Sequence, residues 1–300
     1  MPDQNNSYLL YLAHGNIEIL YEACYSILSF YKTNYANYDT IKIIVYTDNP
    51  ELFYTIFKGK NLTCIPINTS QIADWKGTIN FVHRVKTKVI QDFFSRYSGN
   101  LLYVDSDTVF IKDISPYWGK LNSGSLLMHC MEGIIRDKRN RIIRKIYKYI
   151  DTNILKLPDG ETLKIPLSTQ LWNAGVIGIT DRHKVLLNKI VDMTDAMYPD
   201  CPIHIVEQFA TSYYFQVTTD ITATEDAIYH YWDFKEFRKV LTAFFTHYSG
   251  QTWEAILPHI DKISPIEMVK PKHHYNGLKP IPKLLRKLNK ERWQMPDYQL

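Results

Sequence analysis

The chain has 300 residues and a mass of 35.3 kDa, which suits one large domain or one domain with an appendage. Its 35 basic and 31 acidic residues leave a net charge of +4, and 45% of the residues are hydrophobic. This composition is typical of a globular protein and excludes global disorder and a dedicated nucleic-acid binder. No apolar run reaches the ~18 residues of a membrane span, and four widely spaced cysteines do not favour a disulfide scaffold, so we expect a cytoplasmic protein.

Short apolar runs alternate with helical patterns along the first part of the chain. The apolar runs predict strands, and apolar residues at helical spacing predict helices. Strands that alternate with helices in this way predict a mainly parallel sheet flanked by helices, a Rossmann-like α/β fold. In chain order we expect strands at 8–13, 41–47, 62–67 and 101–105, and helices at 17–31, 51–57 and 81–97.

The second half of the sequence is less regular. Residues 133–150 contain seven basic residues and one acidic residue and predict a basic helical insertion. From residue 264 onward prolines, lysines and arginines become dense, so we treat 264–300 as a basic, Pro-rich C-terminal tail. Between these segments we expect strands at 173–179 and 227–232 and helices at 182–197, 204–215 and 234–248.

Two carboxylates directly follow the fourth predicted strand: Asp105 and Asp107 flank Ser106. Ligands of an open parallel sheet bind at the carboxyl ends of its strands. Carboxylates this close repel each other unless a cation lies between them, and Mg²⁺ or Mn²⁺ suits such oxygen ligands. We therefore expect a divalent metal here, although isolated D-x-D turns are also common as purely structural turns.

Four segments, in this order, resemble the GT-A-fold glycosyltransferases, in particular glycosyltransferase family 8 and its bacterial relatives. The segments are a basic helix start at 81–86, the D-x-D segment 101–118, the sequence WNAGV at 172–176 and the sequence VEQ at 206–208. The resemblance covers about residues 8 to 235. It implies a GT-A fold over 1–263, with 1–110 as the nucleotide-binding half and 111–263 as the sugar and acceptor half.

The resemblance also implies a metal site. Asp105 and Asp107 would bind the metal, Asp105 would also lie near the ribose, and the neighbouring Ser106 would contact the donor. A late histidine would be the third metal ligand, near a lysine that contacts the diphosphate. We prefer His230, followed by Lys235, because it ends a predicted strand and precedes a helix N-terminus that favours phosphate.

Two alternatives to this third ligand remain. His274, with Lys279 five residues later, lies in the Pro-rich tail in a Gly-x-Lys-Pro context that is similar to the family's own histidine motif. Alternatively, His230 is a histidine packed among core aromatic residues and holds no metal.

The nucleotide would lie against the first loop of the sheet. By resemblance, His14 and Gly15 would contact the base and ribose, and Gly15 permits a close approach. An ordinary strand-to-helix turn with Asn16 as the N-cap residue is the alternative. Asp48 ends the second predicted strand on the same edge, where it approaches the nucleotide or caps its own turn.

Arg84 and Lys88 are one helical turn apart and therefore share a helix face. We expect them to neutralise phosphate or to hold the acidic side chains near the metal. A solvated basic face is the alternative interpretation.

The sugar would lie near the two downstream segments. By resemblance, Asn173 would hydrogen-bond the donor sugar, and Gly175 would let the sugar lie close to the backbone. Glu207 and Gln208 would act as base, nucleophile or clamp on sugar hydroxyls. The alternative for Glu207 is a helix N-terminal carboxylate that complements the helix dipole.

These observations predict a metal-dependent hexosyltransferase with Mn²⁺ or Mg²⁺ as cofactor. It would move a sugar from a nucleotide-diphosphate donor, with UDP favoured, to a glycan or glycolipid acceptor in surface polysaccharide or lipopolysaccharide synthesis. The resemblance favours retention of configuration. A nucleotidyltransferase, a sugar-nucleotide hydrolase and a sugar-nucleotide-binding or membrane-docking module without transferase activity are the alternatives.

The two basic segments suggest further contacts. The sequence KLLRKLNKERW places Leu284, Leu285, Leu288 and Trp293 between cations, a pattern that suits peripheral contact with an anionic membrane. The basic segment 133–150 would guide a phosphate-bearing acceptor. Solvated, purely structural charge is the alternative for both segments.

Overall fold

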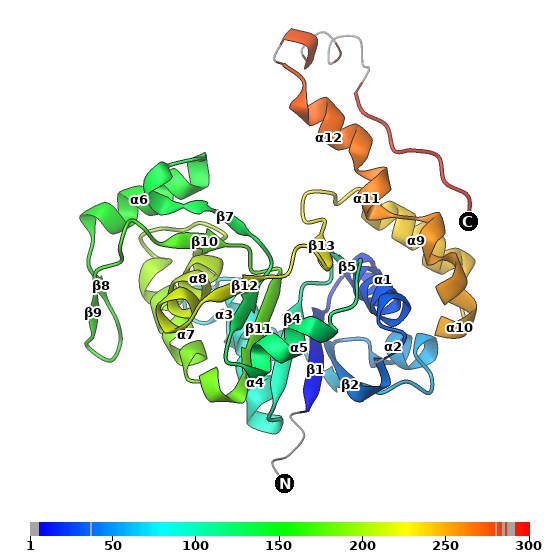
Figure 1. Cartoon of the computed structure of the whole chain (residues 1–300), viewed down its shortest axis with the longest axis horizontal. Coiled ribbons are helices and arrows are strands. Elements are labelled where there is room, and N and C mark those ends of the chain that lie inside the picture. Colours follow the sequence, from blue (N-terminus) through cyan, green and yellow to red (C-terminus); the bar gives the residue numbers. More distant parts are fainter. Residues whose placement is uncertain (1–5, 37, 280, 284–285, 287–291) are drawn as a thin grey trace.

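A seven-stranded sheet forms the centre of the protein (Figure 1). The computed structural model describes residues 6–36, 38–279, 281–283, 286 and 292–300. The strand order is β12-β6-β11-β4-β1-β2-β3, and β11 alone among these strands is antiparallel to both of its neighbours. The strands are β1 (Ser7–Ala13), β2 (Ile41–Thr47), β3 (Leu62–Pro66), β4 (Asn100–Val104), β6 (Leu126–Met128), β11 (Val176–Thr180) and β12 (Ile221–Ala223). The predicted, mainly parallel α/β sheet is therefore confirmed.

Alternation along β1 divides the apolar residues between two layers. Leu9 and Tyr11 face one buried cluster, whereas Tyr8 and Leu10 face the other, because successive side chains of a strand point to opposite faces. Figure 1 shows α1 and α9 on one side of the sheet and α4, α7 and α8 on the other. Such two-sided burial explains why the sheet strands are nearly continuous apolar runs.

The helices begin and end close to the predicted positions where the apolar periodicity is strong. They are α1 (Ile17–Thr33), α2 (Pro50–Ile56), α3 (Thr69–Lys76), α4 (Arg84–Arg96), α5 (Ser115–Asn122), α6 (Arg141–Thr152), α7 (Leu186–Met197), α8 (Val206–Thr218), α9 (Phe237–His247), α10 (Trp253–Ile256), α11 (Pro265–Met268) and α12 (Lys270–Gly277). Short α3 and α5 were not predicted, and the predicted strand at 173–179 begins only at Val176.

Three two-stranded sheets lie outside the central one. They pair β5 (Thr108–Phe110) with β13 (Ile228–His230), β7 (Met131–Ile134) with β10 (Gln170–Trp172), and β8 (Leu155–Lys156) with β9 (Thr162–Leu163). The first pair places His230 opposite Thr108, immediately after the acidic pair.

The segment predicted as a tail begins with ordered structure. Met268 and Val269 are buried in the same cluster as Ile263, and α11 and α12 continue the chain. Trp293 packs against Phe234, with 6.1 Å between the ring centroids. No helix among the described residues is long and apolar enough to span a membrane. The leucines of the predicted membrane-contact pattern, Leu284, Leu285 and Leu288, lie outside the described residues.

Candidate active site

Asp105, Asp107 and His230 form a compact cluster at the carboxyl edge of the sheet. Asp105 follows β4, Asp107 lies two residues later, and the β5–β13 pairing brings His230 to both. One ligand atom from each lies within 4.8 Å of the others, and His230 Nε2 is 3.1 Å from Asp107 Oδ1. Two carboxylates and one imidazole are donors that Mg²⁺ or Mn²⁺ accepts. His274 lies on α12 and is not part of this cluster.

The charge state of Asp107 suits a metal ligand. Burial alone would raise the pKa of Asp107, but the hydrogen bond and charge of His230 and the charge of Lys235 outweigh burial. Together they hold the pKa of Asp107 well below its usual range. The Lys235 ammonium forms an ion pair with Asp107 Oδ2.

Lys86 holds the other carboxylate. Its Nζ is 2.9 Å from Asp105 Oδ2 and 2.8 Å from the carbonyl oxygen of Ala174, and Tyr103 donates a hydrogen bond to Asp105 Oδ1. Burial would lower the pKa of Lys86, but the charges of Asp105 and Glu207 outweigh it and raise that pKa. The sequence analysis assigned no role to Lys86, although Lys86 ends the basic segment 81–86 on which the resemblance partly rested.

Arg84 and Lys88 do not line the site, which corrects their expected roles. The Arg84 guanidinium makes two hydrogen bonds to Asp195 of α7, at 2.7 and 2.9 Å, and a third to the carbonyl oxygen of Trp75. Residues two positions apart on an α-helix project about 200° apart. Since Lys86 faces the site, Arg84 and Lys88 are turned away from it.

A cavity of about 1010 Å³ surrounds the acidic cluster. His14 and Ile19 line one end, and Asn140 of the basic segment lines another part. The exposed ring of Trp232, which the sequence analysis did not single out, also lines it. Of the expected donor-binding residues, the cavity includes His14, Asp105, Ser106, Asn173 and Lys235.

Gly175 lies directly beneath the imidazole of His230. A Cβ atom on Gly175 would be 2.2 Å from His230 Nδ1 and 2.9 Å from Asn173 Oδ1. The histidine ring therefore occupies the space into which a side chain at position 175 would project, and Gly175 still lines the cavity. Asn173 Oδ1 lies 3.0 Å from His230 Nδ1, so Asn173 orients the ring.

Glu132 connects the two segments predicted to bind the sugar. Its carboxylate accepts a hydrogen bond from Asn173 Nδ2 and another from Gln208 Nε2, both at 2.9 Å. All three side chains line the cavity. The sequence offered no signal for Glu132, because it lies in β7, whose pairing with the distant β10 places it here.

Glu207 lies behind this cluster. It is 2% exposed, and its Oε1 accepts hydrogen bonds from the hydroxyl groups of Thr87 and Thr211. Burial raises the pKa of Glu207, while the nearby Lys86 opposes that rise. Glu207 thus lies close to Lys86, and its charge is one of the influences that raise the pKa of that lysine.

The first loop is fixed by the second strand. The N–H group of Gly15 donates a hydrogen bond to Asp48 Oδ2 at 2.9 Å, and Gly15 has φ of +90°, a conformation that favours glycine. Asn16 occupies the N-cap position of α1 without a side-chain capping bond. Burial lowers the pKa of His14, which favours its neutral form.

Arg238 is a further cation at the cavity. Its Nε and Nη2 atoms bond the two carboxylate oxygens of Glu22 at 3.0 and 3.1 Å, and Glu22 is completely buried. Burial raises the pKa of Glu22 to about 6, although its hydrogen bond to Arg238 opposes the rise. This pair could not be predicted from the sequence, because its members are more than two hundred residues apart.

No family model matches the chain, and no curated protein matches its sequence. It is similar to solved structures that are themselves glycosyltransferases. The galactosyltransferase LgtC, solved with donor and acceptor sugar analogs, is 17% identical with a TM-score of 0.47, covering 72% of this chain and 73% of LgtC. GlyE of Streptococcus pneumoniae is 14% identical with a TM-score of 0.49, covering 85% of this chain and 63% of GlyE. Mouse xyloside xylosyltransferase 1 is 10% identical with a TM-score of 0.48, and the match covers 73% of this chain and 84% of the mouse protein. These values describe a distant likeness.

Proposed function

We propose that the chain is a metal-dependent glycosyltransferase that uses a nucleotide-diphosphate sugar, with UDP as the favoured nucleotide. The observation that carries the proposal is the Asp105–Asp107–His230 cluster at the strand edge, which lines a cavity of about 1010 Å³. Lys235 and Arg238 add cations beside the cluster, as a diphosphate requires.

The three cluster residues are the ones that would hold Mn²⁺ or Mg²⁺. Bound there, the ion would supply positive charge to a departing diphosphate. Lys86 keeps Asp105 in place by its ion pair, and Asn173 keeps the His230 ring aimed at Asp107. His14 and the loop held by Asp48 would contact the nucleoside.

Glu132, Asn173 and Gln208 would bind the sugar. Their joined side chains present both hydrogen-bond donors and acceptors to the cavity, which suits sugar hydroxyl groups. Glu207 is enclosed by two threonine hydroxyls, so we assign it the role of supporting Lys86 rather than that of a base or nucleophile. We propose that the anomeric configuration of the sugar is retained, so that the nucleoside diphosphate leaves and the acceptor attacks on the same face of the sugar.

We further propose a glycan or glycolipid acceptor of the kind used in surface polysaccharide or lipopolysaccharide synthesis. The enzyme would work in the cytoplasm, with peripheral membrane contact through the C-terminal segment. That contact rests on the sequence pattern alone, and Trp293 of the pattern packs against Phe234.

A thermal-shift screen tests the donor assignment. UDP-, GDP-, CMP- and dTDP-sugars are each added with and without Mn²⁺, because a ligand that binds the folded state raises the melting temperature. A metal-dependent shift with one nucleotide, followed by transfer of its radiolabelled sugar to a glycan, supports the proposal. Nucleotide binding without transfer to any acceptor would favour a binding module. Formation of a nucleoside triphosphate and a sugar 1-phosphate when pyrophosphate is added to the nucleotide sugar would favour a nucleotidyltransferase.

A further inference from the structure

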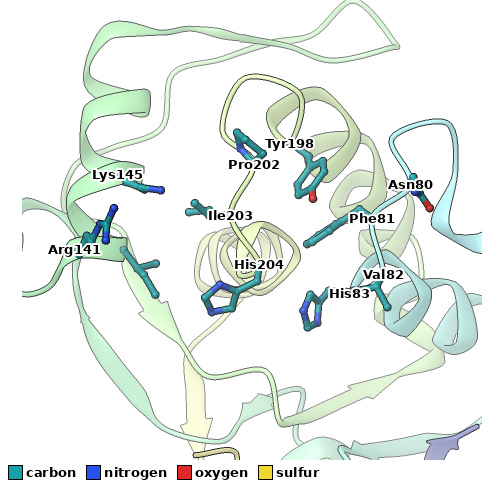
Figure 2. A pocket seen from close by; sticks show the side chains of 11 residues that line it. Asn80, Phe81, Val82, His83, Arg141, Lys145, Tyr198, Pro202, Ile203 and His204 are labelled. Carbon is teal, nitrogen blue, oxygen red and sulfur yellow. The ribbon is translucent and has the colours of Figure 1, made fainter. Parts of the chain in front are cut away.

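A second cavity of about 800 Å³ adjoins the first (Figure 2). Four side chains line both cavities, so the two spaces meet at Val82, His83, Ile142 and His204. Figure 2 shows Arg141 and Lys145 of α6 on one side, facing Phe81 and Tyr198 across the space. The site chemistry described above does not use this second cavity.

The charge of this cavity has one sign. It is lined by the cations Arg141 and Lys145, and no acidic residue is among the described residues that line it. Both side chains are exposed, and neither forms an ion pair within the described part of the chain. Two uncompensated cations beside a cavity attract an anion.

The stability of α6 does not account for these cations. A positive charge at a helix N-terminus opposes the helix dipole, yet Arg141 is the first residue of α6 and the first turn has no acidic residue. Lys145, one turn later, repels Arg141. The helix is held instead by Asn140, which caps it, and by buried isoleucines such as Ile143 and Ile146. A bound anion would offset the repulsion between these two cations and the helix dipole.

The opposite wall of the cavity is aromatic. Phe81 is only 2% exposed and stacks on Tyr198 with 4.1 Å between the ring centroids, so the half-buried Tyr198 and the exposed Val82 supply the surface on this side. Aromatic and apolar side chains pack against the apolar face of a sugar ring, while the nearby imidazoles of His83 and His204 supply hydrogen-bonding groups for its hydroxyls.

We infer that this second cavity binds the acceptor and that the acceptor is an anionic sugar, bearing a phosphate or a carboxylate held by Arg141 and Lys145. The inference rests on the proposed function, since it makes the adjoining cavity the donor site. Because His83 and His204 line both cavities, an acceptor in the second cavity would lie beside the donor site.

The test uses four probes on the full chain: glucose 6-phosphate, glucuronate, glucose and inorganic phosphate. Binding is followed by the NMR signals of the His83 and His204 rings, which line the cavity. The double variant Arg141→Ala/Lys145→Ala is compared with Arg144→Ala/Lys148→Ala. The control pair has the same spacing on the same helix, is likewise exposed and removes the same charge. It differs in that Arg144 and Lys148 line neither cavity.

We expect glucose 6-phosphate or glucuronate to bind more tightly than glucose. The Arg141/Lys145 variant should weaken that binding at least tenfold, because a hydrogen bond to a charged group is worth about that factor. The control variant should change it less than about twofold, since exposed charges act only weakly at a distance. Whichever of the two anionic sugars binds better identifies the acceptor's charged group.

Three results would overturn the inference. One is equal weakening in both variants, which would indicate a diffuse field. Another is glucose binding as tightly as the anionic sugars, or no ring shift with any anion. The third is competition between the anionic sugar and UDP with Mn²⁺, because an acceptor binds beside the donor. If UDP does not bind in a metal-dependent way while the anionic sugar does, the proposed function fails and the anion site remains.

Discussion

The imidazole of His230 rests on the bare backbone of Gly175. A Cβ atom at position 175 would lie 2.2 Å from Nδ1 and 2.4 Å from Cε1 of that ring. These distances are too short for non-bonded atoms, so the ring would have to move. The amide nitrogen of Asp105 also donates a hydrogen bond to the Gly175 carbonyl oxygen at 2.8 Å. Residue 175 thus contacts two of the three proposed metal ligands, and the contact with His230 requires that it be glycine.

The change Gly175→Ala should displace the His230 ring and weaken Mn²⁺ binding at least tenfold, while the chain still folds. Gly119→Ala is the control, because a Cβ there meets nothing within 4 Å and its φ is not positive. Mn²⁺ affinity is measured by electron paramagnetic resonance and folding by circular dichroism. Unchanged Mn²⁺ affinity in the Gly175 variant would show that His230 is not a ligand.

The two candidate histidines can be separated by direct comparison. His230→Ala should abolish metal-dependent nucleotide binding, because it removes one of three ligands, whereas His274→Ala on α12 should leave it unchanged. Isothermal titration of UDP in the presence of Mn²⁺ measures both. Loss only in the His274 variant would reverse the assignment.

Strong local patterns made much of the fold predictable. The apolar runs that became β1, β2 and β4 are buried on both faces, so their character is visible without knowledge of their partners. The acidic pair was predictable for the same reason, since it directly follows β4. His230 and Lys235 could be placed because a strand end and a helix start lie beside them.

The remaining site residues depend on contacts that one sequence does not display. Glu132 reaches the site through the pairing of β7 with β10, and Arg238 through its bond to Glu22 on another helix. The choice between Arg84 and Lys86 depends on the rotation of α4 about its axis. The apolar positions of α4 fix that rotation. Because basic residues lie on more than one face of the helix, their charges alone do not show which of them points into the site.

Lys86 and Arg84 allow a matched test of that rotation. Their ion pairs are equally enclosed, with side-chain exposures of 11% for Lys86 and 12% for Arg84. Lys86→Met and Arg84→Met should each lower the free energy of unfolding by about 2 kcal/mol, because each leaves a partly buried carboxylate unpaired. Only the Lys86 variant should also weaken UDP binding with Mn²⁺. Equal loss of UDP binding in both would contradict the site geometry.

Glu22 should give the stability a pH dependence of known sign. Burial raises its pKa from 4.5 to about 6, so the folded state favours the protonated form. The stability from this group is present below pH 4.5 and is lost as the pH rises through about 6. The loss is about 2 kcal/mol.

Glu22→Gln removes this titration and retains a hydrogen-bond acceptor for Arg238. The difference in unfolding free energy between the parent chain and the variant, measured by urea denaturation, should therefore decline across this pH range. Subtracting the variant cancels the other titrating groups. A difference that is constant with pH would show that the pKa of Glu22 is the same in the folded and unfolded states, which would contradict the raised pKa.

The most direct test of the account is the binding of UDP with and without Mn²⁺ to the parent chain and to Asp107→Asn, which keeps the side-chain shape and removes the charge. The account predicts that Mn²⁺ strengthens UDP binding to the parent chain at least tenfold, and that the variant folds but loses this strengthening. UDP binding that is independent of Mn²⁺ in the parent chain, or equally metal-dependent in the variant, would contradict a metal site at Asp105, Asp107 and His230.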